Sequence, residues 1–171
     1  MTITSSEHFT AVQNALQRID TRQLDHVVDL IETAGLIVTC GNGGSAATAI
    51  HLASDLRSVG LPAFDLLSPS KVTQIDNDDG HAYIFRNQAA SLDALVIAFS
   101  GSGTSKNIQA LAYAVGERMV LFSSEMNPFK YPGVYVVRVD SDDYEVIEDV
   151  HLAMCHAIKK ELKARDGNGT I

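Results

Sequence analysis

The chain has 171 residues, 46% of them hydrophobic and 20% charged, which is enough to bury a full core as one soluble globular domain. Its formal net charge of -8, without any basic run, argues against a nucleic-acid groove, because phosphodiester binders need clustered positive charge. No apolar stretch is long enough to span a membrane, and residues 1–6 lack the features of a signal peptide. We therefore expect a cytoplasmic protein in which Cys40 and Cys155 are buried free thiols.

Two amphipathic helices are expected before any strand. Apolar residues recur at helical spacing over 6–19, with Ser6 as a candidate cap. Asp20 is expected to cap a second helix, which Gly35 ends. The first helix can pack on its own domain or on a neighbouring subunit, and the sequence leaves both arrangements open.

The rest of the chain alternates strand patterns with helix patterns. Strands are predicted at 36–40, 62–67, 94–99, 119–122 and 134–139. Helices are predicted from residue 46 to a stop at Gly60, at 81–90, at 106–115 and at 144–164, with a polar segment at 68–79 that ends in a turn at 77–80. This alternation predicts an α/β fold: a three-layer α/β/α sandwich with about five parallel strands in a flavodoxin-like order. We expect one domain over 1–171, with N-terminal helices at 1–34, a parallel core at 35–164 and a flexible tail at 165–171.

A glycine-rich corner follows the first predicted strand. The run Gly41-Asn42-Gly43-Gly44-Ser45 leads directly into a helix, and Ser45 is a candidate cap. The free amides at the start of that helix can bind a phosphate without any Lys or Arg. The alternative is a plain strand-to-helix connection that happens to be rich in glycine.

A second loop, at residues 100–105, follows the predicted strand at 94–99. It offers four hydroxyls, on Ser100, Ser102, Thr104 and Ser105, that can surround a phosphate with neutral donors. Neither loop fits the P-loop or the dinucleotide fingerprint. In a flavodoxin-like order the first and third strands are neighbours, so we expect both loops over one crevice that takes a phosphorylated small molecule.

Two helices carry groups that can bind a metal ion. His51 and Asp55 are four residues apart, so they share one helix face. On the closing helix, spacing alone favours Glu148 with His151. For either pair the alternative is an ordinary polar helix face.

Four segments together resemble the phosphoheptose isomerases, which are sugar-isomerase (SIS) domain proteins. These segments are 40–45, 51–56, 100–105 and 147–151. The resemblance implies an aldose–ketose isomerase that interconverts sedoheptulose 7-phosphate and D-glycero-D-manno-heptose 7-phosphate. It also implies a homotetramer with zinc near subunit interfaces, and no nucleic-acid or membrane partner.

The resemblance also assigns residues. It implies metal ligands at His51, Asp55, Glu148 and His156, and it makes His151 structural. Our hypothesis gives Asp55 the role of base and His156 that of acid. The positions that match the family's substrate-binding residues are Asn42, Gly43, Gly44, Ser45, Asp55, Asn77, Asp78, Ser100, Gly101, Ser102, Ser105 and Glu148.

The chain departs from the family pattern at three of these positions. Asp55 stands where the family has Glu, Glu148 where it has Gln, and Gly101 where it has Thr. These changes leave open which metal ion and which sugar phosphate the protein binds. Two alternatives follow: an isomerase of another sugar phosphate, or a non-catalytic adaptor similar to the relatives that bind the replication initiator.

Overall fold

The computed structural model describes residues 4–167 and contains a five-stranded parallel sheet in the order β2-β1-β3-β4-β5. The strands are β1 (Ile37–Gly41), β2 (Ala63–Asp65), β3 (Leu95–Phe99), β4 (Met119–Ser124) and β5 (Tyr135–Val139). All four pairings are parallel. The flavodoxin-like order predicted from the sequence is confirmed, and β1 and β3 are neighbours.

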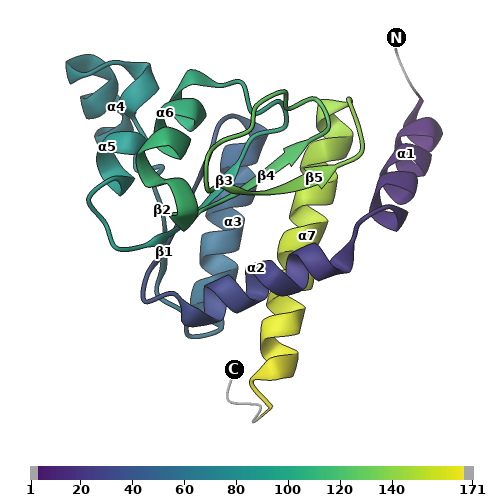
Figure 1. Cartoon of the computed structure of the whole chain (residues 1–171). Coiled ribbons are helices and arrows are strands. Elements are labelled where there is room, and N and C mark those ends of the chain that lie inside the picture. Colours follow the sequence, from purple (N-terminus) through teal and green to yellow (C-terminus); the bar gives the residue numbers. More distant parts are fainter. Residues whose placement is uncertain (1–3, 168–171) are drawn as a thin grey trace.

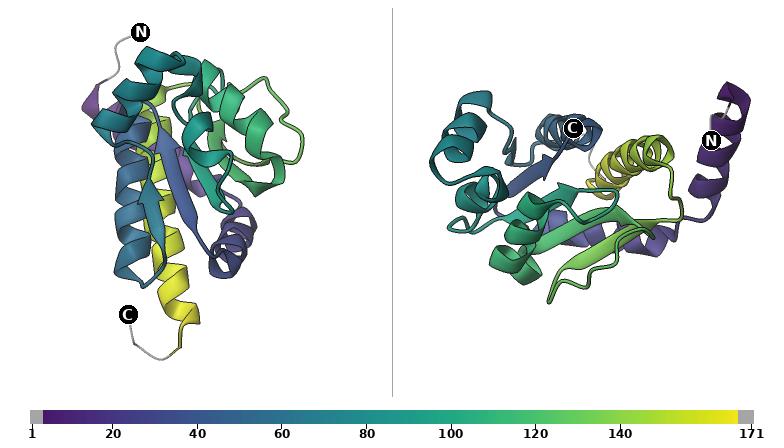
Figure 2. Two further views of the ribbon diagram at one scale, coloured as in Figure 1. Left: turned by 90° about the vertical axis from the view of Figure 1, so that its left-hand side faces the viewer. Right: turned by 90° about the horizontal axis from the view of Figure 1, so that it is seen from above.

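Helices cover both faces of the sheet (Figures 1 and 2). They are α1 (Ser5–Gln17), α2 (Thr21–Thr33), α3 (Gly44–Ser58), α4 (Pro69–Asp78), the 3-10 turn η1 (His81–Tyr83), α5 (Arg86–Ala89), α6 (Lys106–Val115), the 3-10 turn η2 (Gly116–Arg118) and α7 (Tyr144–Arg165). One apolar layer joins α2, α3 and α7 to the sheet, and a second joins α4, α5 and α6 to the opposite face. Among the described helices, none is both long and apolar enough to cross a bilayer.

Alternation along the strands produces these two layers. On β3, Val96 and Ala98 belong to the layer on the α6 side, whereas Ile97 and Phe99 belong to the layer beneath α3 and α7. Successive side chains of a strand point to opposite faces, so a strand buried on both faces must be apolar throughout. This is why the run at 94–99 predicts the central strand so clearly.

The predictions for the start of α3 and for the segment after β2 are wrong. Ser45 does not cap α3, because the helix begins at Gly44, two residues before the predicted start, and Gly43 is its cap, without a side-chain cap bond. The polar segment after β2 does not end in a turn at 77–80, because α4 continues through Asp78. Pro69 supplies the fixed backbone angle that suits a first helical position, and Ile75 buries the inner face of α4.

The first helix begins at a capping box rather than at Ser6. Thr4 caps the backbone of Glu7, and the Glu7 carboxylate bonds back to Thr4. Figures 1 and 2 show α1 standing away from the body of the domain, beyond α7. It is tied to its own chain by a 2.9 Å hydrogen bond between His8 Nε2 and Asp149 Oδ2. Phe9 nevertheless stays 70% exposed, so this helix keeps an apolar surface that the described residues do not cover.

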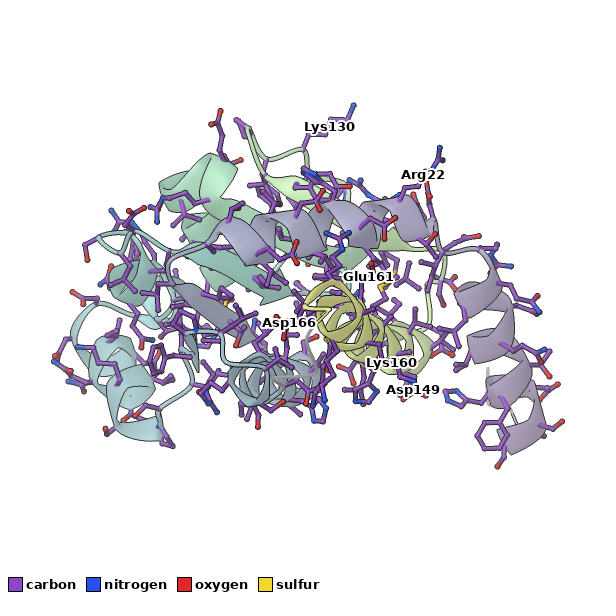
Figure 3. All side chains as sticks on the ribbon, turned by 90° about the horizontal axis from the view of Figure 1, so that it is seen from below. Arg22, Lys130, Asp149, Lys160, Glu161 and Asp166 are labelled. Atoms are coloured by element: carbon purple, nitrogen blue, oxygen red, sulfur yellow. The ribbon has the colours of Figure 1, made fainter. Side chains whose placement is uncertain are left out.

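The end of α7 is anchored to α2. Arg165, the first residue of the predicted flexible tail, is the last residue of α7 and bonds Asp29, Glu32 and Glu161 at 2.6–3.0 Å. These carboxylates raise the pKa of Arg165 above its usual range. Figure 3 shows Glu161 on the side of α7 that faces α2. The tail prediction is therefore wrong for Arg165, and its residues 168–171 lie outside the described residues.

His151 is packed into the apolar layer beneath α7. It is 1% exposed, its ring lies 5.8 and 5.9 Å from the rings of Phe99 and Phe122, and its Nε2 donates to the Ser123 carbonyl at 3.1 Å. Burial lowers its pKa to about 4. These surroundings favour the structural role expected of it.

Replacing His151 should reduce the acid sensitivity of the fold. The folded-state pKa lies below the unfolded value near 6.5, so the unfolded chain binds the proton first as the pH falls. Stability is then lost between about pH 6.5 and pH 4, with a loss of about 2 kcal/mol at pH 5. We expect the drop in urea-unfolding free energy from pH 7.5 to pH 5 to be smaller in His151→Leu by that amount.

The exposed His26 on α2 provides the control. His26→Gln should keep the full drop of the wild type. An equal drop in wild type and His151→Leu would contradict the explanation.

Candidate active site

The glycine corner between β1 and α3 brings the backbone close to other groups. Gly43 has a positive φ of 56°, which favours glycine. A Cβ on Gly41 would lie 2.5 Å from the Ser45 carbonyl oxygen, and one on Gly44 would lie 2.0 Å from Glu148 Oε2. A side chain therefore does not fit at Gly41, where the close atom is backbone, and one at Gly44 would displace the Glu148 carboxyl. The missing side chain at Gly44 lets the Glu148 carboxyl from α7 pack against the start of α3.

The serine loop after β3 is held from behind by polar groups of β4 and the segment that follows it. Ser124 Oγ donates to the Gly101 carbonyl at 2.7 Å, and Tyr131 Oη donates to the Gly103 carbonyl at 2.6 Å. Ser123 Oγ also donates to the Ser100 carbonyl, at 2.8 Å. These bonds hold the loop through its carbonyls, so its hydroxyls do not have to fix its shape.

The two loops open into one cavity of about 140 Å³. It is lined by Asn42, Ser45, Phe99, Ser100, Gly101, Ser102, Ser105, Tyr144 and Glu148. Seven of these nine residues are among the predicted substrate-binding positions, and the structure brings them together. Phe99 and Tyr144 are the two that the sequence did not indicate.

A pair of amides joins the glycine corner to α6, the helix that follows the serine loop. Asn42 Nδ2 donates to Asn107 Oδ1 at 3.0 Å, and Asn107 Nδ2 donates back to Asn42 Oδ1 at 2.9 Å. Asn107 is 0% exposed and lies in the first turn of α6, directly behind the serine loop. The sequence analysis missed it. The one signal was a polar amide in the first turn of a helix whose buried face is apolar.

A second hollow of about 340 Å³ lies along α3 and α7 and shares one residue with the first. Its lining includes Gly44, His51 and Glu148, and Glu148 also lines the cavity between the loops. A molecule held between the loops therefore passes Glu148 to reach His51.

Three of the four predicted metal ligands form one cluster. His51, Asp55 and His156 offer ligand atoms that all lie within 4.8 Å of one another. The Nε2 atoms of the two histidines are 2.9 Å apart, and His51 Nε2 is 3.4 Å from Asp55 Oδ2. That Oδ2 is buried and has no hydrogen-bond partner among the described residues. A buried carboxylate oxygen without a partner facing two imidazoles fits a divalent cation.

Glu148 lies outside this cluster, so its role as a metal ligand stays a prediction. Asn77 and Asp78 lie in the last turn of α4, where Asn77 Nδ2 bonds Asp78 Oδ1 at 2.9 Å, and neither lines the two hollows described here. Their substrate-binding role also stays a prediction. Lys159 is a further residue that the sequence analysis missed. Its Nζ donates to Asp55 Oδ1 at 2.7 Å, and its position three residues after His156 was the available signal.

Comparisons with known proteins agree with this architecture. The family model for the SIS domain matches residues 7–120. The phosphoheptose isomerase of Alkalilimnicola ehrlichii is 33% identical over 145 residues, covering 75% of this chain and 74% of that protein. One from Helicobacter pylori is 31% identical over 171 residues, covering 88% of each. The solved phosphoheptose isomerase of Neisseria gonorrhoeae is 26% identical, with a TM-score of 0.81 over 93% of this chain and 94% of that one.

The sheet order, the two loops and the family match define a SIS-domain protein. Within that class the chain belongs to the phosphoheptose isomerase family and is a sugar-phosphate isomerase of the aldose–ketose type.

The amide pair should act as one unit in stability. Asn42→Ala and Asn107→Ala should each destabilise the fold by about 1–3 kcal/mol, because each removes both hydrogen bonds between the two amides. The double variant should lose less than the sum of the two, by about 0.5–3 kcal/mol. Urea unfolding of the four proteins measures this coupling. Additive losses would mean that the pair does not tie the loops together.

Proposed function

We propose that this chain interconverts sedoheptulose 7-phosphate and D-glycero-D-manno-heptose 7-phosphate in a reaction that depends on a divalent metal ion. The observation that carries the proposal is the position of Glu148, which lines both the cavity between the loops and the hollow that contains His51. A sugar bound by its phosphate between the loops thus has a path along α3 toward the histidines and Asp55.

The phosphate end is bound by neutral donors. The backbone amides at the start of α3 have no partners within the helix and carry the positive end of its dipole. Ser45, Ser102 and Ser105 line the same cavity and can donate hydroxyl protons to phosphate oxygens. Because the two loops face each other, a phosphoryl group between them is contacted from both sides and is fixed in orientation.

We assign proton transfer to Asp55 and His156. Isomerisation moves a proton between C1 and C2 of the sugar through an enediol. Asp55 Oδ2 has no hydrogen-bond partner in the part of the chain that the structure describes, which supports its role as the base that accepts this proton. His156 reaches the same cluster from α7 and serves as the acid that protonates the neighbouring oxygen.

His51, Asp55 and His156 are the residues that would hold the metal, with Glu148 as the expected fourth ligand. Two imidazole nitrogens and carboxylate oxygens are ligand types of zinc, which we propose as the ion. When bound, the metal polarises the sugar carbonyl. Asp55 and Glu148 each add a carboxylate, and carboxylates also suit harder cations, so metal analysis of the purified protein decides the identity.

We further propose that the enzyme is a cytoplasmic homotetramer. Phe9 and Leu16 on α1 are 70% and 38% exposed, and they offer an apolar surface for another subunit. This surface supports the first helix packing against a neighbour in addition to its His8–Asp149 contact with its own chain.

A second sugar phosphate is favoured by one observation at the serine loop. A Cβ on Gly101 would lie 3.3 Å from the Tyr144 ring, so Tyr144 occupies the space beside the position where the family has Thr. The serine loop therefore lacks one hydroxyl that could bind phosphate, and an aromatic ring occupies the neighbouring space. A panel of ketose phosphates, scored by the aldose formed, should show whether the preferred sugar has changed.

The central test is turnover of sedoheptulose 7-phosphate before and after chelation. We expect conversion to the aldose, its loss on chelation, and its recovery when zinc is returned. His156→Ala should lower kcat by roughly 100-fold or more, because the acid is removed, while circular dichroism stays unchanged.

A purified protein that carries no stoichiometric metal and converts no sugar phosphate would favour the adaptor function instead. Full activity in His156→Ala would remove this histidine from the mechanism.

Glu148 gives a separate test of the phosphate cavity. Its carboxylate lines the cavity meant for an anion, so Glu148→Gln should remove a like-charge repulsion and lower KM by roughly threefold or more. The exposed Glu145 on the same helix provides the control, and Glu145→Gln should leave KM unchanged. A KM that rises in Glu148→Gln would show that the carboxylate binds the substrate directly.

A further inference from the structure

Lys159 lies beside the proposed base and has no role in the function described so far. It follows His156 by three residues on α7, so the two side chains leave neighbouring positions on that helix. Its Nζ donates to Asp55 Oδ1 at 2.7 Å. α3 and α7 therefore each contribute two side chains to one group of four: His51 and Asp55 from α3, His156 and Lys159 from α7.

The contact between Lys159 and Asp55 is shielded from solvent. The exposed fraction of the side chain is 26% for Lys159 and 12% for Asp55. Fully exposed ion pairs contribute little because water and salt screen them, whereas a shielded pair with a short hydrogen bond constrains both partners. The carboxylate of Asp55 is thus fixed through Oδ1.

The two oxygens of Asp55 have different surroundings. Oδ1 accepts a hydrogen bond from Lys159 Nζ, while Oδ2 is buried, has no hydrogen-bond partner within residues 4–167 and lies 3.4 Å from His51 Nε2. A carboxylate with both oxygens free can turn or bind an ion through both of them. With Oδ1 held, Oδ2 is the one oxygen available to a ligand or a proton.

We propose that Lys159 is a positioning residue that holds Asp55 Oδ1, keeps Oδ2 directed at the histidines, and limits how tightly the cluster binds a divalent cation. The inference rests on the proposed function for the role of Asp55 as base. Its effect on metal binding follows from charge alone, because an ammonium group beside the carboxylate opposes the attraction of a second cation.

The test measures zinc affinity and turnover on the same set of variants. The protein is stripped of metal and titrated with Zn²⁺ in competition with a chromophoric chelator, and kcat and KM are measured with sedoheptulose 7-phosphate. The variants are Lys159→Met, which removes the charge and the donor, and Lys159→Arg, which keeps both. Lys160→Met is the matched control, because Lys160 is exposed and, as the next residue of the helix, points about 100° away from Lys159.

We expect Lys159→Met to bind Zn²⁺ about tenfold more tightly and to lose about tenfold in kcat, with KM within about twofold of the wild type. The first change follows from the lost positive charge and the second from a carboxylate that is free to turn. KM is expected to change little because the phosphate group of the sugar binds between the two loops, away from Lys159. Lys159→Arg should keep both values within about threefold of the wild type, and Lys160→Met should change neither.

The proposal is overturned if either the zinc affinity or the kcat of Lys159→Met stays within twofold of Lys160→Met. If Lys159→Met does not fold, Lys159→Gln, which lacks the charge but keeps a donor, must still bind Zn²⁺ more tightly. A wild-type protein that does not convert sedoheptulose 7-phosphate would refute the proposed substrate. The metal-binding half of the inference would then be decided by the zinc titration alone.

Discussion

The site depends on the register between β1 and β3. These two strands run parallel as neighbours, and the last residue of β1, Gly41, is paired with the last residue of β3, Phe99. Because both strands stop at the same level, the glycine corner and the serine loop begin side by side. The anion site can then be built from backbone amides and hydroxyls alone, without a lysine or arginine drawn across from another part of the fold.

A second requirement is the packing of α3 against α7. The same helix that begins at the glycine corner carries His51 and Asp55 further along, so the proposed phosphate site and the proposed metal site share one rigid element. α7 lies alongside and supplies Glu148 near the start of α3 and His156 beside His51 and Asp55. Side chains on regular helices are held more accurately than side chains on loops, which suits a proton transfer that depends on ångström-scale placement.

Much of the architecture could be predicted from the sequence because it follows from patterns among residues that are close together in the chain. The apolar run at 94–99 and the two loops that follow strands predict the parallel sheet, and topology rules then put the loops together. The spacing of His51 and Asp55 predicts a shared helix face, which the structure contains. The first two helices are also periodic enough to be predicted, although the start of α1 depends on the pairing of Thr4 with Glu7 rather than on Ser6.

The rest could not be predicted, because it depends on contacts between distant segments. Asn107 and Lys159 look like ordinary surface residues until α6 is placed beside β1 and α7 beside α3. Arg165 looks like the start of a tail until α2 is placed beside it. The helix α4 was not predicted for a different reason. The many polar residues of this segment suggest a turn, whereas the buried Ile75 packs the segment against the sheet as a helix.

Because both ends of the proposed site lie on α3, the helix fixes the distance between them. Each residue of a helix advances about 1.5 Å, so the seven positions from Gly44 to His51 set an interval of about 10 Å along the axis. A molecule anchored at the glycine corner engages the histidines only if its carbon chain extends across that interval. Under the proposed function, this interval would select against triose phosphates, whose carbon chain is shorter, through the pitch of the helix.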